Sequence, residues 1–283
     1  MPATARFPFA PLLRPLRGTI VGEVRQLLNG GKPPVARRPD GWFGPGSVTW
    51  RVHGDVAGML VGGIAGLLLQ MLHPAVLAGV WDHSRFRADM LGRLRNTARF
   101  IAITTYGGAD EAAHAVAKVR SIHERVAGAL PDGTAYAACD PALLAWVHVT
   151  ETTSFLAGWR RYAEPGMSRA DQDRYFAEMA QVAERLGADP VPRSRAGAEA
   201  LIARMRPALR TDARTREVAT VLLNQAADTR AQQPLRDLTM RAGVDLLPDW
   251  ARRMHGLPVR SFATPLVRAG TLGLARTLRW AFA

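Results

Sequence analysis

The fold is decided by residues 56–72, VAGMLVGGIAGLLLQML, which His73 and Pro74 follow. The segment is apolar on every side, which is typical of a buried core helix, and proline ends it by disfavouring helical backbone at the residue before it. Its longest apolar run, residues 56–69, has 14 residues and is short for a membrane span. Glycine recurs at every fourth position, at Gly58, Gly62 and Gly66. This spacing predicts that another helix or a flat ligand approaches the segment closely.

Helical patterns dominate the chain from residue 51 onward. Asp140 with Pro141 forms a good N-cap and first-turn pair, and Ser168 with Asp171 resembles a capping box. No segment shows strand alternation between hairpin turns. The sequence therefore predicts an all-α fold, a single globular multi-helix domain with nine to eleven helices. Besides residues 56–72, the predicted helices cover residues 86–106, 110–130, 141–162, 168–186, 195–206, 213–231, 235–245 and 264–281.

Charge divides the chain into three parts. A length of 283 residues favours one large domain, and the net charge of +13 lies mostly at its two ends. Residues 1–50 form a Pro/Arg-rich N-terminal arm, with one short predicted helix at 18–28. Residues 251–283 hold six arginines and no acidic residue. Because residues 51–250 are nearly balanced, the sequence argues against nucleic acid as a partner.

Several classes of protein are excluded by the motifs. A single cysteine, Cys139, rules out an internal disulfide and a zinc site built mainly on cysteine. The signatures of phosphate-binding loops, dinucleotide folds, serine hydrolases and zinc proteases do not occur. A di-iron bundle needs two Glu-x-x-His pairs, and only Glu111 with His114 forms one. These absences leave the histidines as the residues most able to carry chemistry.

Two histidines stand out by position. The spacing of His123 with Val116, Val119, Val126 and Leu130 places it on the buried face of the predicted 110–130 helix. His148 lies in the apolar helix at 141–162. A buried neutral imidazole can be the axial ligand of a haem iron, and Arg120 and Arg125 beside His123 could pair with haem propionates. The alternative is a core histidine bonded to a backbone carbonyl.

Three polar residues share a face near the start of the 86–106 helix. Arg93, Asn96 and Thr97 have the i, i+3 and i+4 spacing that puts a cation, an amide and a hydroxyl on one side. Donors arranged in this way could hydrogen-bond an iron-bound oxygen species. The alternative is a solvated helix start.

These motifs follow one another in the order of a known family. The first block contains residues 69–76 (LQMLHPAV), 82–86 (DHSRF) and 92–97 (GRLRNT). Residues 123–128 (HERVAG) and 140–150 (DPALLAWVHVT) follow, and then residues 186–192, which begin with Leu-Gly and end with Val-Pro. Over residues 45–250 the chain resembles the oxygenase family of MpaB, the mycophenolic-acid pathway oxygenase, and the latex-clearing rubber oxygenases.

The resemblance implies a globin-like, all-α core that binds haem b and uses dioxygen to cleave carbon–carbon double bonds of isoprenoid chains. It makes His123, which lies 30 residues after Arg93, the axial iron ligand, with His148 as the second candidate. It gives Arg93, Asn96 and Thr97 the catalytic positions on the opposite face of the iron. The rubber oxygenases carry Lys where this chain has Asn96, which argues against rubber cleavage itself but not against haem binding. The resemblance thus implies an oxygenase catalytic domain at residues 51–250, with dioxygen and a small lipophilic, isoprenoid or alkene-containing substrate as partners.

Two other functions stay open from the sequence. The chain could be a haem protein without oxygenase activity, such as a sensor, a peroxidase-like enzyme or a haem carrier. It could also be a non-haem helical scaffold whose function resides in the N-terminal arm, residues 1–50, and in the C-terminal segment, residues 251–283. Haem uptake and dioxygen consumption separate the three.

The C-terminal segment, residues 251–283, bears on partners. Its predicted helix is basic and amphipathic, which favours peripheral contact with a membrane surface through residues 264–283. The alternative is a terminal helix docked on the body with its arginines in solvent. The sequence predicts a cytoplasmic protein that contacts the membrane peripherally, and the Pro-rich arm allows a homodimer.

Overall fold

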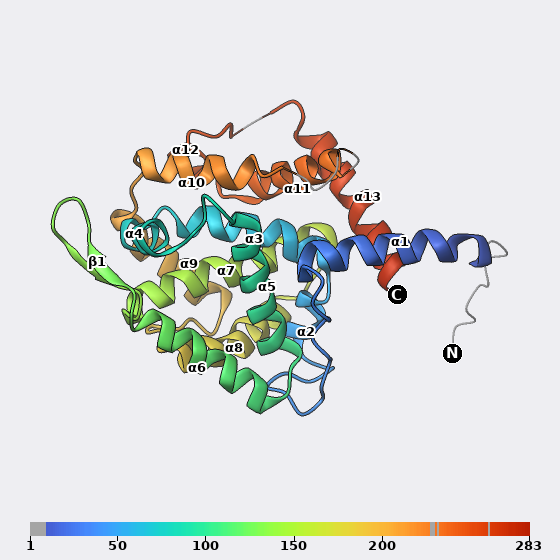
Figure 1. The fold of residues 1–283 in the computed structure, drawn as a ribbon, viewed down its shortest axis with the longest axis horizontal. Helices are drawn as coiled ribbons and strands as arrows, with labels where there is room; N and C mark the ends of the chain where they lie inside the picture. The colour runs from blue at the N-terminus through green and yellow to red at the C-terminus, as the bar shows by residue number, and fades with distance from the viewer. Residues whose placement is uncertain (1–9, 227–229, 231, 260) are drawn as a thin grey trace.

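The computed structural model describes residues 10–226, 230, 232–259 and 261–283. Within these residues the chain folds into thirteen α-helices, one short 3-10 helix and one two-stranded hairpin (Figure 1). The all-α prediction is confirmed.

Two central helices, α3 (Val56–Gln70) and α7 (Pro141–Tyr162), are surrounded by the others. Before them come α1 (Ala10–Asn29) and α2 (Val48–His53). The segment between them contains α4 (Pro74–His83), α5 (Met90–Tyr106), α6 (Ala109–His123), β1 (Ala127–Ala129) and β2 (Ala135–Ala137). After α7 follow α8 (Arg169–Leu186), α9 (Arg195–Met205), the 3-10 turn Arg206–Ala208, α10 (Ala213–Leu223), α11 (Gln233–Leu246), α12 (Asp249–Met254) and α13 (Thr264–Phe282).

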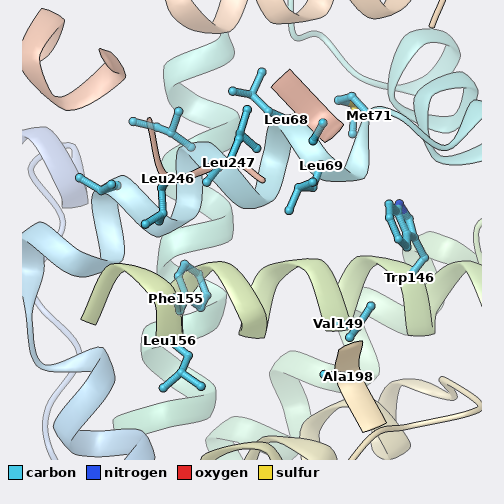
Figure 2. Packing of buried hydrophobic residues seen from close by; sticks show 14 of the residues in the cluster. Leu68, Leu69, Met71, Trp146, Val149, Phe155, Leu156, Ala198, Leu246 and Leu247 are labelled. Atoms are coloured by element: carbon cyan, nitrogen blue, oxygen red, sulfur yellow. The ribbon is translucent and has the colours of Figure 1, made fainter. Parts of the chain in front are cut away.

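The glycines of α3 allow its backbone to touch that of α7. A Cβ atom on Gly62 would lie 2.7 Å from the Ser154 carbonyl oxygen, and one on Gly158 would lie 2.5 Å from the Gly58 carbonyl oxygen. Side chains on either side of this seam form the core, as the row of residues on the two helices in Figure 2 shows. The glycine spacing predicted that a helix or a flat ligand approaches α3, and the structure places a helix, α7, against it.

The predicted helix starts are confirmed by their caps. The Asp140 carboxylate accepts hydrogen bonds from the backbone N–H groups of residues 142 and 143 at the start of α7. The Ser168 hydroxyl accepts from the Asp171 N–H at the start of α8. That helix ends at Gly187, whose φ of +96° is the left-handed conformation that favours glycine.

Three predictions about elements are corrected. The helix predicted to reach residue 130 ends at His123, and a hairpin follows in which Ala127 pairs with Ala137. The two three-residue strands around the turn at Gly133 contain no β-branched residue, and Tyr136 is their one residue that favours strands, which explains the miss. The count exceeds eleven because α2 and α12 have six residues each, too few for a periodic pattern. Helix α10 ends at Leu223; the predicted extension to 231 falls partly on residues 227–229 and 231, outside the described residues.

The helices α1 and α13 lie on one side of the molecule (Figure 1). α1 packs on α13, where the Arg17 Nε donates to the carbonyl of Ala281 at 2.8 Å. α13 is anchored on the body by an ion pair of Arg279 with Asp55, 2.6 Å long, and by one of Arg268 with Asp245, 2.8 Å long.

No single helix among the described residues is long and apolar enough to cross a membrane. α3 and α4 together meet the length and composition of a span, but the chain bends by 104° between them. Most of α3 is buried in the core, as expected of a core helix.

Candidate functional site

Two helix pairs enclose the region that contains the predicted site residues. α5 turns into α6 at Gly107 and Gly108 and packs against it, whereas α3 and α7 form the central pair. α5 also packs against α1 and α2, and its Leu94, Phe100 and Ile101 side chains pack against the core. Figure 1 shows α6 on the lower side of the molecule, with α7 and α3 above it. We call the region between the α5–α6 hairpin and the α3–α7 pair the slot.

Helix α5 is loosely packed along the slot. Residues 98–103 are all partly exposed, and six consecutive helical residues cover every face of a helix. By contrast, α7 has buried residues along most of its length. Helix α5 is therefore only partly covered by the helices around it.

One face of α7 is turned toward the slot. His148, Glu151 and Phe155 have the i, i+3 and i+7 spacing of residues on one face of a helix. The Phe155 ring lies 5.5 Å from the ring of His53. The Nδ1 of His53 is 2.8 Å from the Thr105 hydroxyl of α5. The same side of α7 lies close to α3, because a Cβ on Gly66 would lie 3.4 Å from the Glu151 Cα.

His148 is suited to bind a metal. Its side chain is buried, and its Nε2 atom has no hydrogen-bond partner among the described residues. Burial lowers the pKa of His148 to about 4, so the imidazole is neutral near pH 7. A buried neutral imidazole with an unused nitrogen has the chemistry of an axial haem ligand. The alternative in which a backbone carbonyl accepts from Nε2 does not occur.

His123 is the last residue of α6. Its ring is half-buried, burial lowers its pKa, and it forms no hydrogen bond in the described part of the chain. The hairpin that follows brings the end of α6 next to the start of α7, because the Ala138 N–H donates to the carbonyl of Val126 at 2.8 Å. The sequence predicted that four apolar residues share a helical face with His123. Two of them, Val116 and Val119, lie on α6, but Val126 and Leu130 lie beyond its end.

Arg93 lies where α5 meets α3, α4 and α10. It lines a small cavity of about 10 Å³ with Leu67 and Leu68 of α3 and Leu222 of α10. Burial lowers the pKa of Arg93, and no ion pair of the described residues includes it. A half-buried guanidinium without an acidic partner is ready to bind an anionic group.

The structure does not bring the other predicted polar residues into the interior with Arg93. Asn96 and Thr97 are exposed, and the Thr97 hydroxyl donates to the carbonyl of its own helix at residue 93, 3.2 Å away. Arg120 and Arg125 are also exposed. The Nη1 of Arg120 donates to the carbonyl of residue 185 at 3.4 Å, and that of Arg125 to the hydroxyl of residue 121 at 3.0 Å.

The donor set suits a haem better than a bare metal ion. The described residues contain no group of three or more His, Cys, Asp and Glu side chains that could hold an ion. Haem iron is held in its macrocycle and needs from the protein one nitrogen donor in an apolar setting. His123 and His148 both offer such a nitrogen, and His148 does so with an orphaned buried atom.

Glu151 is a site residue that sequence reasoning missed. Its side chain forms no hydrogen bond with the described residues, and burial raises the pKa of Glu151 to about 7. The carboxyl also lies close enough to Tyr175 to raise the pKa of the Tyr175 hydroxyl. The signal was its spacing, three residues after His148 on the same helix. His53, which holds α5 and α8 together through Thr105 and Tyr175, gave no such local signal because its partners are distant in sequence.

The raised pKa of Glu151 makes a testable prediction for the haem-free protein. An unfolded glutamate ionises near its ordinary value of 4.5, whereas the folded carboxyl keeps its proton to about pH 7. Stability therefore falls as the pH rises from about 4.5 to about 7, by up to about 3 kcal/mol. Glu151→Gln removes this loss, so urea unfolding should find the variant more stable than the native chain at pH 8 and equal to it at pH 4.5. The same difference at both pH values would contradict a buried, protonated Glu151.

Comparison with known proteins identifies the family of the chain. The family model described as "ER-bound oxygenase mpaB/B'/Rubber oxygenase, catalytic domain" matches residues 50–280, which include α3 to α12 and nearly all of α13. The match extends beyond residue 250, where the sequence resemblance ended. No curated protein and no solved structure matches the chain. Because this family model covers most of the chain, the chain belongs to the mpaB/rubber oxygenase family and carries that family's oxygenase catalytic domain.

Proposed function

We propose that this protein is a haem b-dependent oxygenase that acts on a small lipophilic substrate, an isoprenoid or another alkene. The observation that carries the proposal is the neutral, buried imidazole of His148, whose Nε2 atom has no partner among the described residues, together with the half-buried imidazole of His123 at the end of α6. Family membership supports the oxygenase part. The globin-like character of the core stays a prediction.

His123 would hold the haem iron as axial ligand, and His148 is the second candidate. Haem supplies the redox chemistry of dioxygen that amino-acid side chains lack. Both imidazoles are neutral near pH 7 because burial lowers their pKa, so each keeps a lone pair for the iron without first losing a proton. Arg120 and Arg125, exposed around the end of α6, would pair with the propionates.

Arg93 is the proposed charge-stabilising donor. Its guanidinium is half-buried against the apolar side chains of Leu67 and Leu68, a setting in which a hydrogen bond to developing negative charge is stronger than in water. Asn96 and Thr97 remain proposed as additional donors, and their exposed side chains would have to turn toward the slot. The apolar surface of α3 beside Arg93 would exclude water and receive the alkene part of the substrate.

The test is dioxygen consumption by the haem-loaded protein with a series of isoprenoid and terpenoid alkenes, together with detection of carbonyl products. Arg93→Ala should lower kcat at least about tenfold, because it removes the only proposed donor that is half-buried at the slot. Arg95→Ala is the matched control, since the Arg95 Nε donates to the carbonyl of Leu27, away from the slot, and it should leave kcat unchanged.

The outcome also separates the other functions. A protein that binds haem but consumes no dioxygen with any of these substrates is a haem protein of another kind. A protein that folds and never takes up haem is a helical scaffold. Either result contradicts the proposed activity.

A further inference from the structure

Exposed apolar side chains concentrate at the two ends of the chain. Of the large hydrophobic residues that are exposed among the described residues, all but two lie on α1, on α13 or just before α13. These six are Leu16, Leu27, Phe262, Leu266, Trp280 and Phe282. Phe262 is fully exposed, and Leu266 is 76% exposed. We call this set the terminal apolar face.

Two residues of the terminal apolar face, Leu266 and Trp280, do not lie on the side with which α13 docks. The docking side buries Val267, Ala275 and Leu278 against the body. Leu266 and Trp280 belong to the same helix but are turned outward. Helix α13 is therefore apolar on two sides, and the protein covers only one of them. α13 is docked on the body, as the alternative expected, but Leu266 and Trp280 are exposed beside its arginines.

The two terminal helices present this face together. α1 packs against α13, and both lie at the same side of the molecule (Figure 1). The Arg17 Nε holds the end of α13 by its hydrogen bond to the carbonyl of Ala281. Leu16, next in sequence to Arg17, thus belongs to the same region as Trp280 and Phe282.

The charge around the terminal apolar face is positive. Residues 251–283 contain six arginines and no acid. Arg279 and Arg268 are used in ion pairs that anchor α13, but Arg276 is exposed and has no ion pair with any described residue. Arg25 of α1 is exposed and unpaired in the same part of the chain. Exposed tryptophan and phenylalanine with a basic rim are what an anionic lipid surface attracts.

We propose that α1 and α13 form a docking surface for an anionic lipid bilayer. A second copy of the chain is the poorer occupant, because a two-fold contact would bring the same arginines against one another. The bilayer offers anionic headgroups to the arginines and an apolar interior to Phe262, Leu266 and Trp280. This surface lies outside the slot, so the proposal stands independently of haem binding.

The experiment is co-sedimentation of the full chain with vesicles of phosphatidylcholine alone and of phosphatidylcholine mixed with phosphatidylserine. We expect binding to the mixed vesicles only, and a loss of binding at raised salt. The double variant Leu266→Ser/Trp280→Ser should bind mixed vesicles at least about tenfold more weakly. Both replaced side chains are exposed, so the fold should be kept, and thermal unfolding checks this.

A pair of charge reversals controls for net charge. Arg276→Glu should weaken binding several-fold, whereas Arg216→Glu, the same change at an exposed position of α10, should not. Equal effects of the two reversals, or full binding by the double variant, would overturn the proposal. So would wild-type protein that stays in the supernatant with mixed vesicles. If the double variant instead converts a dimer to a monomer in sedimentation velocity and vesicle binding is unchanged, the face is an interface between copies.

Discussion

The His123→Ala variant is expected to bind haem at least about a hundredfold more weakly than the native chain. The substitution removes the imidazole that we propose as axial ligand and leaves the apolar slot to hold the macrocycle by packing alone. His123 is half-buried and forms no hydrogen bond with the described residues, so its loss should not unfold the protein. Haem titration followed by visible absorption gives the affinity, and thermal unfolding of the haem-free variant confirms that it is folded.

His114→Ala is the matched control for this prediction. His114 lies on the same helix but is exposed to solvent, and its loss should leave haem affinity unchanged. If His123→Ala kept native affinity while His148→Ala lost it, the axial ligand would be His148 and the family-based assignment would be wrong. If neither variant changed the affinity or the spectrum, neither histidine would be the ligand.

The largest effect on stability is expected from Gly62→Ala. The new Cβ would lie 2.7 Å from the Ser154 carbonyl oxygen and 2.9 Å from the Phe155 Cα, both of them backbone atoms of α7. α3 and α7 would have to move apart along the seam that forms the core. We expect a loss of about 2–3 kcal/mol in the free energy of unfolding, the range of an overpacked core, measured by urea denaturation.

The neighbouring glycine provides the control. A Cβ on Gly63 meets only the Cε1 atom of the Phe155 ring, at 3.7 Å, an ordinary van der Waals distance. Because alanine is favoured over glycine inside a helix, Gly63→Ala should leave stability unchanged or raise it by up to about 1 kcal/mol. Equal effects of the two substitutions would show that close contact of the helices does not determine stability here.

Much of the fold could be predicted because its signals are local. The cap at Asp140 and the left-handed glycine at Gly187 fixed helix ends within a few residues. The hairpin was missed because it depends on a turn at Gly133 and on pairing of alanines that carry no strand preference. The partner of α3 also could not be read from its glycines, which allowed a helix or a ligand equally.

The site was less predictable because it depends on contacts between distant segments. The sequence marked His123 and His148 as candidates, but it did not show that a hairpin joins the two helices that carry them. The hydrogen bond between residues 126 and 138 closes the distance between their helices. Arg93 and Thr97 share a helical face by spacing, yet only Arg93 meets α3 and α10, because the next turn of α5 is open to solvent.

The central claim, that this chain binds haem b in the slot, is tested most directly by the visible absorption spectrum of the purified protein after haem is added in steps. The account predicts a Soret band distinct from that of free haem, which saturates at one haem per chain and is lost in His123→Ala. A spectrum that stays that of free haem at every ratio, from a protein shown to be folded, would contradict it.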